Sequence, residues 1–429
     1  MASPTPDRAV GAHDSAPPLR NRRFLTVMGG EGLSQIGDAA FAISLAWLVV
    51  QETGSVAALT GILVAQAVPR GALLLLGGSV TDRRSPRFVL LVCNVARAVA
   101  MAAVAVPVLT GSWSLWHLYV LSVLMGVAGA FATPATESVL PQLLKPADFA
   151  RGNAIQSMVE QVSFLVGPLI GGVLTTVYGA GTAMLVNSVT FGIAAATCLV
   201  IPRRAALVAV HAGVAGHLLE GLKHAWDSHS VRMVLLVVSA ATLSYSGLFA
   251  VGLPTLALSL GSSALGLSIL VSSWGAGQLI GAMAAAITGL PQRWGLLIIG
   301  MTLAEGVVFI LLGQVDDVWW ASALLIPLGV GVAYSSDVAL PTFIQTTSPP
   351  HLLARVSSLL ALPRAVFEPV SIALLGLVLQ WSVAWGFAVA ALPILVAGVI
   401  LACDRRTREL SATSVGSDTR DRSGVGPGD

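Results

Sequence analysis

The sequence carries very little charge. Only 10% of its 429 residues are Asp, Glu, Lys or Arg, whereas soluble domains carry about 25% charged residues. The formal net charge is only +2, which argues against a basic surface for nucleic acid. Hydrophobic residues instead make up 55% of the chain, and its mean hydropathy is +0.84. This composition predicts a polytopic membrane protein.

Cysteine is scarce and nucleotide-binding motifs are absent. Cys93 and Cys198 fall in apolar stretches and Cys403 follows the last of these, without the spacing of a metal site or a disulfide. We therefore expect packing cysteines rather than metal ligands. Because there is no Walker-type loop and no complete catalytic constellation, the sequence predicts no enzyme, no metal, no cofactor and no use of ATP.

Long apolar runs are what the sequence has in abundance. The shortest, residues 295–313, forms about 28 Å of helix, which is enough to cross a bilayer. The polar tails at both ends are typical of disordered segments. We predict twelve transmembrane helices at 24–50, 57–80, 88–109, 115–140, 153–178, 182–201, 233–258, 264–289, 295–313, 318–341, 357–379 and 382–402.

The basic residues fall on alternate loops of this map. All but three of the 23 Lys and Arg residues lie in the two tails or in loops on the tails' side, and the opposite loops hold none. The exceptions are Arg70, Arg97 and Arg364, which lie inside spans. We expect Arg97 to pair with an acid or a carbonyl elsewhere in the bundle. The positive-inside rule then predicts that both termini are cytoplasmic.

The longest loop, 202–232, divides the chain into two six-span halves. We expect cytoplasmic tails at 1–21 and 403–429 around helical bundles at 22–201 and 233–402. The loop either only tethers the halves or also holds an amphipathic surface helix, which its apolar spacing favours. The residues with that spacing are Leu218, Leu219, Leu222, Ala225 and Trp226.

The two halves end their fourth spans alike. Glu137-x-x-x-Pro141 closes span four, and Asp337-x-x-x-Pro341 closes span ten about 200 residues later. Such six-span repeats are a transporter plan in which the binding site lies at the repeat interface. Because both acids are near the cytoplasmic ends of their spans, we expect Glu137 and Asp337 to be solvated or to form a gate.

Two carboxylates lie within the first span. Glu31 and Asp38 are two helical turns apart and therefore share a face with Ser34 and Gln35. An ionisable group at this depth costs roughly 2.5–3.5 kcal/mol on insertion scales, so it marks a functional site. We predict that Glu31 couples protons or recognises a cation. For Asp38, proton coupling and a structural hydrogen bond both remain open.

Other charges inside spans have simpler interpretations. Arg364 and Glu368 are four residues apart on span eleven, so we predict a buried charge pair. Glu305 lies in span nine, which we expect to be peripheral, and a structural role is predicted for it.

The segment 77–87, which reads GGSVTDRRSPR, is predicted to be the loop after span two. Gly78 permits close helix approach, Asp82 can accept hydrogen bonds, and Arg83 and Arg87 supply cytoplasmic charge. The segment resembles the signature loop of the major facilitator superfamily, G-x-x-x-D-R-x-x-x-R. The resemblance implies that Asp82 acts in gating rather than in substrate contact. A purely topogenic charged loop is the alternative.

Span five contains Gly167, Pro168, Gly171 and Gly172 in the pattern G-P-x-x-G-G. The glycines let another helix pack closely, and Pro168 removes a backbone donor. The pattern looks like the core of the antiporter motif of exporters in the superfamily, with Ser163 where the fuller motif has glycine. A generic small-residue packing face is the alternative.

Longer segments resemble the third drug:proton antiporter family, which includes macrolide-efflux and enterobactin-export proteins. The similarity covers roughly residues 22–402, but span four lacks the arginine of other drug antiporters, so no proton relay is carried over to it. Where this family commonly has glutamine, the chain has Glu31. The similar segments are SQIGD at 34–38, FATPA at 131–135, LPQL at 140–143, RGNA at 151–154 and QTTSP at 345–349.

The resemblance implies an all-α integral membrane protein with the major facilitator fold, in which twelve helices form two six-helix pseudo-repeats. Spans one, four, seven and ten would surround the cavity. The candidates for proton coupling or for lining this cavity are therefore Glu31, Gln35, Asp38, Glu137 and Asp337. We expect a monomer in a bacterial cytoplasmic membrane that exports a small amphiphilic drug, antibiotic or siderophore-like compound in exchange for protons. Proton-coupled uptake is one alternative, and a non-transporting membrane scaffold or sensor is another.

Overall fold

The computed structural model describes residues 18–202, 229–288, 294–335 and 353–408. Twelve helices in these ranges are long and apolar enough to cross a membrane, which confirms the twelve predicted spans. In the N-terminal half they are α1 (Arg22–Thr53), α2 (Val56–Arg83), α3 (Pro86–Leu109), α4 (Leu115–Glu137), α6 (Phe149–Tyr178) and α7 (Ala180–Cys198).

The C-terminal half begins with a composite span. This seventh span consists of α9 (His229–Gly247), a π-helical segment (Leu248–Gly252) and α10 (Leu253–Ser259). The other five spans are α11 (Ala264–Thr288), α12 (Trp294–Leu312), α13 (Val318–Val332), α15 (Leu353–Leu379) and α16 (Val383–Cys403). Two short helices, α5 (Leu140–Leu143) and α17 (Arg405–Arg408), follow the fourth and twelfth spans.

Some predicted features lie outside the described residues. They are the amphipathic helix of the long loop, most of the two tails, and Asp337 with its following Pro341. Of the cysteines, Cys93 and Cys198 are buried as predicted, whereas Cys403 is exposed.

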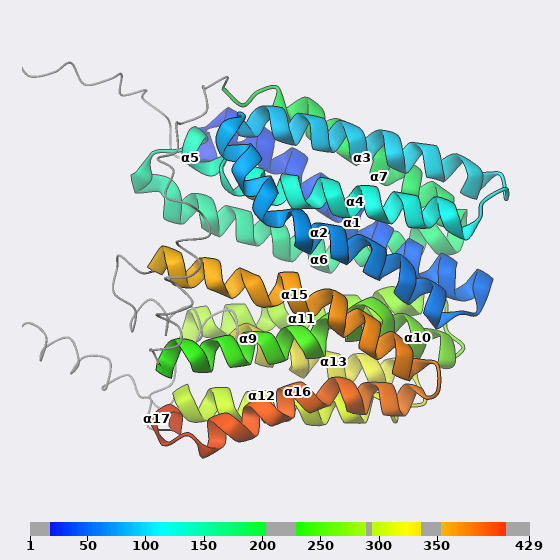
Figure 1. The fold of residues 1–429 in the computed structure, drawn as a ribbon, viewed down its shortest axis with the longest axis vertical. Coiled ribbons are helices and arrows are strands. Elements are labelled where there is room, and N and C mark those ends of the chain that lie inside the picture. The colour runs from blue at the N-terminus through cyan, green and yellow to red at the C-terminus, as the bar shows by residue number, and fades with distance from the viewer. Residues whose placement is uncertain (1–17, 203–228, 289–293, 336–352, 409–429) are drawn as a thin grey trace, which may run out of the picture.

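The two bundles lie one above the other, and both short helices α5 and α17 lie at the same end of the molecule (Figure 1). We call this end the tail side and the opposite end the far side. The helix pairs that pack in one half recur in the other: the second span packs on the fourth and the third on the sixth in each. This repeated packing is the structural form of the two pseudo-repeats.

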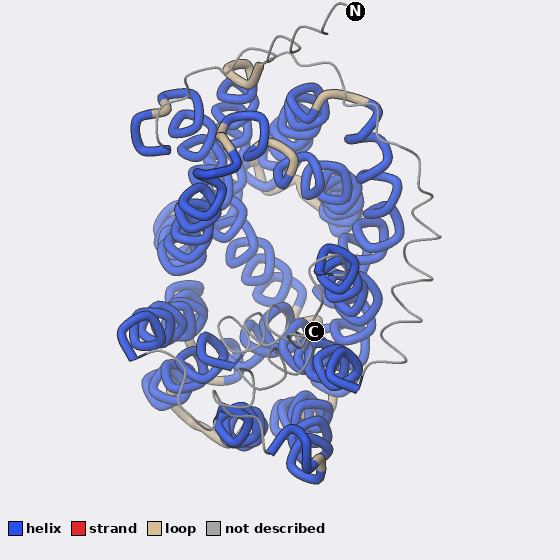
Figure 2. Tube along the Cα trace, turned by 90° about the vertical axis from the view of Figure 1, so that its left-hand side faces the viewer, coloured by secondary structure: helices blue, strands red, loops and turns tan. Residues whose placement is uncertain are grey.

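The two halves share one hydrophobic core at the far side. That core joins Trp47 and Leu59 of the first half to Leu253 and Phe387 of the second. A separate core on the tail side, around Phe24, contains residues of the N-terminal half alone. The view along the helices from the tail side shows how helices of both halves surround the middle of the molecule (Figure 2).

The two halves contact each other from the far side down to mid-depth. Near the far side, Gly172 of α6 faces Ser268 of α11. At mid-depth, the rings of Phe164 and Trp274 meet with centroids 5.0 Å apart. The Ser272 hydroxyl also donates to the Leu165 carbonyl at 2.9 Å. The described contacts therefore close the halves on the far side rather than on the tail side.

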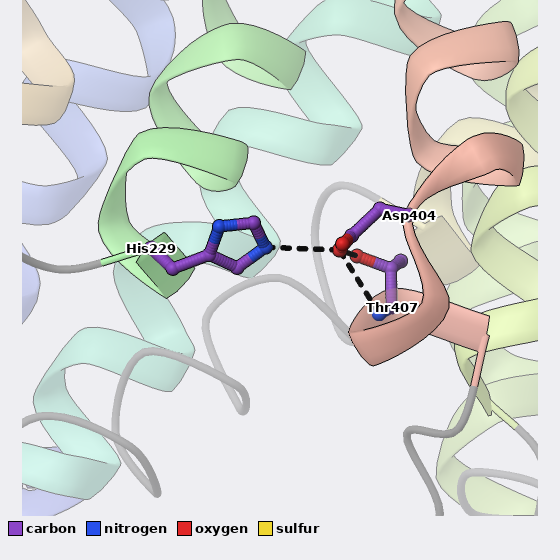
Figure 3. Close-up of polar contacts among 3 residues, drawn as sticks. All are labelled: His229, Asp404 and Thr407. Carbon is purple, nitrogen blue, oxygen red and sulfur yellow. Dashed lines mark hydrogen bonds and ion pairs between the residues drawn. The ribbon is translucent and has the colours of Figure 1, made fainter.

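A polar contact fastens the C-terminal half at the tail side. Nε2 of His229, where α9 begins, lies 3.0 Å from Oδ2 of Asp404, just after α16 (Figure 3). The same oxygen accepts hydrogen bonds from the Thr407 backbone N–H at 3.1 Å and hydroxyl at 2.6 Å. Burial raises the pKa of Asp404, but the hydrogen bonds from Thr407 and His229 outweigh burial and lower it to about 2.

Candidate functional site

A polar cavity of about 470 Å³ lies inside the N-terminal half, between the tail side and mid-depth. It brings together Glu31, Gln35, Asp38 and Glu137, four of the five predicted cavity residues; Asp337 lies outside the described part. Helices α1, α2, α3, α4 and α6 all contribute to its wall. Its other polar lining residues are Ser34, Gln66, Arg70, Asn94, Arg97, Thr133, Thr136, Gln156 and Glu160.

The two acids of α1 have different partners. Glu31 accepts a hydrogen bond from Gln35 on its own helix, with Nε2 and Oε1 3.3 Å apart. Asp38 accepts one from Nδ2 of Asn187 on α7, at 3.2 Å. Asn187 is fully buried, and its own Oδ1 accepts from the Thr190 hydroxyl at 2.9 Å. Asp38 therefore has the structural hydrogen bond that the sequence left open, and it also faces the cavity.

Two arginines supply positive charge to the same cavity. Arg97 attracts both Glu31 and Asp38, and Arg70 attracts Asp38. The prediction that Arg97 pairs with an acid holds only as this electrostatic attraction: in the described residues no ion pair within 4.0 Å involves Arg97, and its Nε atom is buried without a hydrogen-bond partner. The guanidinium carbon lies instead 5.4 Å from the ring centroid of Phe191. The guanidinium group of Arg97 therefore attracts two carboxyl groups without forming a direct ion pair in the part of the chain that is described.

The glycine pattern of span five packs α6 against two helices. A methyl group at Gly167 would meet the Ile36 carbonyl and Ala39, and one at Gly171 would meet the Ala40 backbone, so both glycines let α6 approach α1 closely. Gly172 faces α11 of the other half. The predicted close packing is confirmed, and a role in antiport stays a prediction.

Ser163, which stands where the fuller antiporter motif has glycine, does not break this packing. Its side chain is only 3% exposed, and its hydroxyl donates to the Gly32 carbonyl of α1 at 3.2 Å. This hydrogen bond across the α1–α6 contact gives the buried Ser163 hydroxyl an acceptor. The substitution exchanges close approach for a hydrogen bond at this level.

The segment 77–87 differs from the prediction in two ways. It is mostly helical, because α2 continues to Arg83 and α3 begins at Pro86. The expected close approach at Gly78 is wrong, since nothing lies within 4 Å of a methyl group placed there. Gly77 makes that approach instead, to the Ala130 carbonyl of α4.

The charged residues of this segment serve the N-terminal half. Arg87 donates from Nη1 to the Ile201 carbonyl at 2.9 Å and so fastens α3 to the end of α7. Arg83 is exposed, and Asp82 lies in the last turn of α2. The structure does not describe the Asp82 side chain, so its gating role stays a prediction.

The predicted buried charge pair of span eleven is wrong. Arg364 is exposed, and no ion pair within 4.0 Å joins it to Glu368 in the part of the chain that the structure describes. A spacing of four residues permits such a pair on a helix but does not require the side chains to turn toward each other. Glu368 instead lines a second cavity.

This second cavity, of about 310 Å³, lies between the halves. Phe164 and Pro168 line it from one half, and Phe249 and Ile372 from the other. It is mostly apolar and adjoins the polar cavity. The residues that line both cavities are Ala42, Leu63, Gln66 and Arg70.

Sequence reasoning missed the polar residues of α2. Gln66 and Arg70 are one helical turn apart in an otherwise apolar span, which is a signal that could have identified them. Asn187 gave no such signal, because it is a single amide in span six and no sequence spacing relates it to Asp38 in span one.

Residues 27–367 match the sequence model of the Major Facilitator Superfamily. The chain belongs to this family. It is 28% identical to the multidrug efflux pump Tap of Mycolicibacterium fortuitum over 88% of this chain and 94% of that protein. It is 20% identical to macrolide efflux protein A of Streptococcus pyogenes, over 82% of this chain and 88% of that one.

Solved structures of other transporters share the fold. The bacterial homologue of the human lysosomal transporter Spinster, in an inward-facing and unoccupied conformation, is 15% identical with a TM-score of 0.65. It covers 94% of this chain and 99% of its own. The nucleoside transporter NupG is 11% identical with a TM-score of 0.70, covering 91% and 100%. This facilitator is therefore a multi-pass membrane transporter with the fold of transporters rather than of enzymes.

Proposed function

We propose that this facilitator exports a small amphiphilic compound across the cytoplasmic membrane in exchange for protons. The observation that carries the proposal is the pair of adjoining cavities. The polar one, with Glu31 and Asp38, suits a polar or charged head group, and the apolar one suits a hydrophobic body. Arg70 and Gln66 stand at their junction. In this proposal, one ligand spans both cavities past these shared lining residues.

The distribution of basic residues supports a cytoplasmic tail side, with both termini in the cytoplasm. The halves meet on the far side, so the polar cavity is placed for entry from the cytoplasm. Export then requires the halves to rock about the mid-depth cavities, closing on the tail side and parting on the far side. The gating role proposed for Asp82 and Arg83 belongs to this step.

Export rather than uptake is supported by the relatives. One is named a multidrug efflux pump and the other a macrolide efflux protein. The glycine pattern of α6, which resembles an antiporter motif, points the same way. In this scheme, Asp38 and Glu31 take up protons from outside and release them inside, and the protein works as a monomer without ATP.

Everted membrane vesicles that carry the protein test the proposal. We expect them to accumulate erythromycin or ethidium when the lumen is made acidic, and Asp38→Asn and Glu31→Gln to abolish or strongly reduce accumulation. Depletion of the same probes from the lumen would instead establish uptake. A broad probe panel that gives no flux, with both variants folded and without phenotype, would favour the scaffold or sensor alternative.

A further inference from the structure

Glu305 is a buried carboxyl group in the C-terminal half, away from both cavities. It lies on α12 in the ninth span, and only 5% of it is exposed. The Ser335 hydroxyl donates to its Oε1 at 3.3 Å, and the Tyr245 side chain is a second polar neighbour. Glu305 therefore faces the seventh and tenth spans, on the side of α12 that is turned into the bundle.

Both polar neighbours of Glu305 lie in or close to irregular turns of their helices. Tyr245 lies three residues before the π-helical segment Leu248–Gly252. Ser335 belongs to a π-helical turn at 333–335, where α13 ends. Single π turns are rare and occur frequently at functional sites. One carboxyl group thus lies between two spans that depart from regular α-helix within the described residues.

The turn beside Tyr245 is also connected to the interface cavity. The Ser371 hydroxyl of α15 accepts from the Gly247 N–H at 2.8 Å and donates to the Leu243 carbonyl at 2.6 Å. The next residue of α15, Ile372, lines the cavity between the halves. The Tyr245 ring also packs against Phe249, a second lining residue, with centroids 6.0 Å apart.

Among the described residues of the helices around Glu305, none offers it a charge partner within the hydrophobic interior. On the described parts of α9, α13, α16 and α17, the titratable and charged groups besides Tyr245 lie toward the tail side. They are His229, Arg232, Tyr334, Cys403, Asp404, Arg405, Arg406 and Arg408. The Ser335 hydroxyl donates to Glu305, and the Tyr245 side chain is its other polar neighbour. An unpaired carboxylate is costly in such surroundings, and a proton is the simplest way to remove its charge.

We propose that Glu305 is a second proton-binding site, and that its protonation sets the shape of the seventh and tenth spans around the interface cavity. The inference rests on the proposed proton-coupled transport. A carboxylate only accepts hydrogen bonds, whereas the protonated acid also donates one. Proton binding adds an O–H bond to one carboxyl oxygen, and this new donor takes one of the two neighbouring hydroxyl oxygens, of Ser335 or Tyr245, as its acceptor. The added hydrogen bond biases the π turns beside these residues.

Infrared difference spectroscopy of the full-length protein in liposomes tests the proton site without any cargo. A pH step is expected to give a deuterium-sensitive carboxylic-acid band that persists in the Glu31→Gln, Asp38→Asn double variant and disappears in Glu305→Gln. Tyr245→Phe, which keeps the carboxyl group, is expected to shift that band to higher frequency. A band unchanged by both substitutions would overturn the proposal.

Labelling at the interface cavity tests the link to helix shape. In a background with the three native cysteines replaced by alanine, Ser246→Cys reports access to the cavity that Ser246 lines. The maleimide labelling rate is expected to depend on pH, and Glu305→Gln is expected to remove at least half of that dependence. An unchanged dependence would overturn the link. Because neither measurement uses transport, a failed efflux assay would leave their outcomes distinguishable.

Discussion

Asn187 of α7 donates a hydrogen bond from Nδ2 to Oδ1 of Asp38 on α1, at 3.2 Å. The amide is fully buried while the carboxyl group faces the polar cavity. The bond therefore fixes one oxygen of Asp38 and leaves the group open to the cavity on its other side. Asn187 is a positioning residue for the acid that the proposed proton coupling requires.

Removing the Asn187 amide should destabilise the folded protein. We expect Asn187→Ala to lower the free energy of unfolding by about 1.5–3 kcal/mol, the range for a hydrogen bond to a charged group. Thermal unfolding of the purified protein in detergent measures the change. Thr190→Val, which removes only the hydroxyl that donates to Asn187, should cost less. A larger loss in Thr190→Val than in Asn187→Ala would contradict this account of the Asp38 contact.

Gly77 and Gly78, two adjacent glycines near the end of α2, provide a matched test of the segment 77–87. Gly77→Ala should destabilise the protein by about 1–3 kcal/mol, because the new methyl group would overlap the Ala130 carbonyl. Gly78→Ala should not, because nothing lies within 4 Å of its methyl group. The melting temperatures of the two variants measure this difference. Equal shifts would show that contact with α4 does not distinguish Gly77 from Gly78. A transport defect confined to Gly78→Ala would support gating.

The glycines of α6 allow a similar comparison. Gly171→Ala should destabilise the protein by about 1–3 kcal/mol, since a methyl group there collides with the Ala40 backbone of α1. Gly192→Ala on α7 is the control, because its methyl group would meet nothing within 4 Å. Urea or thermal denaturation in detergent provides the readout. A stable Gly171→Ala protein would mean that α1 and α6 are less closely packed than described.

The tail-side contact of Asp404 should depend on pH in a defined direction. Its pKa is lowered in the folded protein to about 2, from an ordinary value near 3.9. The contact therefore stabilises the fold above about pH 4, and the stabilisation disappears as the pH falls through about 2.

Asp404→Ala isolates that contribution. We expect its melting temperature to lie below that of the natural protein at neutral pH, and the difference to shrink as the pH is lowered from about 4 towards 2. Asp316→Asn, at an exposed carboxylate, is the control. A difference that stayed constant over this range would rule out the ionised Asp404 as its source.

The sequence was sufficient for the twelve spans because spans depend on composition, which needs no knowledge of side-chain directions. The orientation inferred from loop charge stays a prediction. The sequence also identified Glu31 and Asp38, since an acid in an apolar span is costly wherever it points. Contacts that depend on helix rotation could not be predicted. Gly77 and Gly78 are equal in sequence, yet only one faces α4.

Side-chain pairings could not be predicted from the sequence either. Arg364 and Glu368 have the spacing of an ion pair, but Glu368 lines the cavity between the halves while Arg364 is exposed. The hydrogen bond between Asp38 and Asn187 joins residues 149 positions apart. No periodicity within either helix indicates such a contact.

The central claim is that cargo and protons exchange at the carboxyl groups of α1. The most direct test measures protons released into a weakly buffered detergent solution when the purified protein binds the compound that gives the strongest vesicle accumulation. We predict that the natural protein releases protons on binding, and that the Glu31→Gln, Asp38→Asn double variant releases at least tenfold fewer at saturating ligand. Equal proton release from both proteins, with binding intact, would contradict the account.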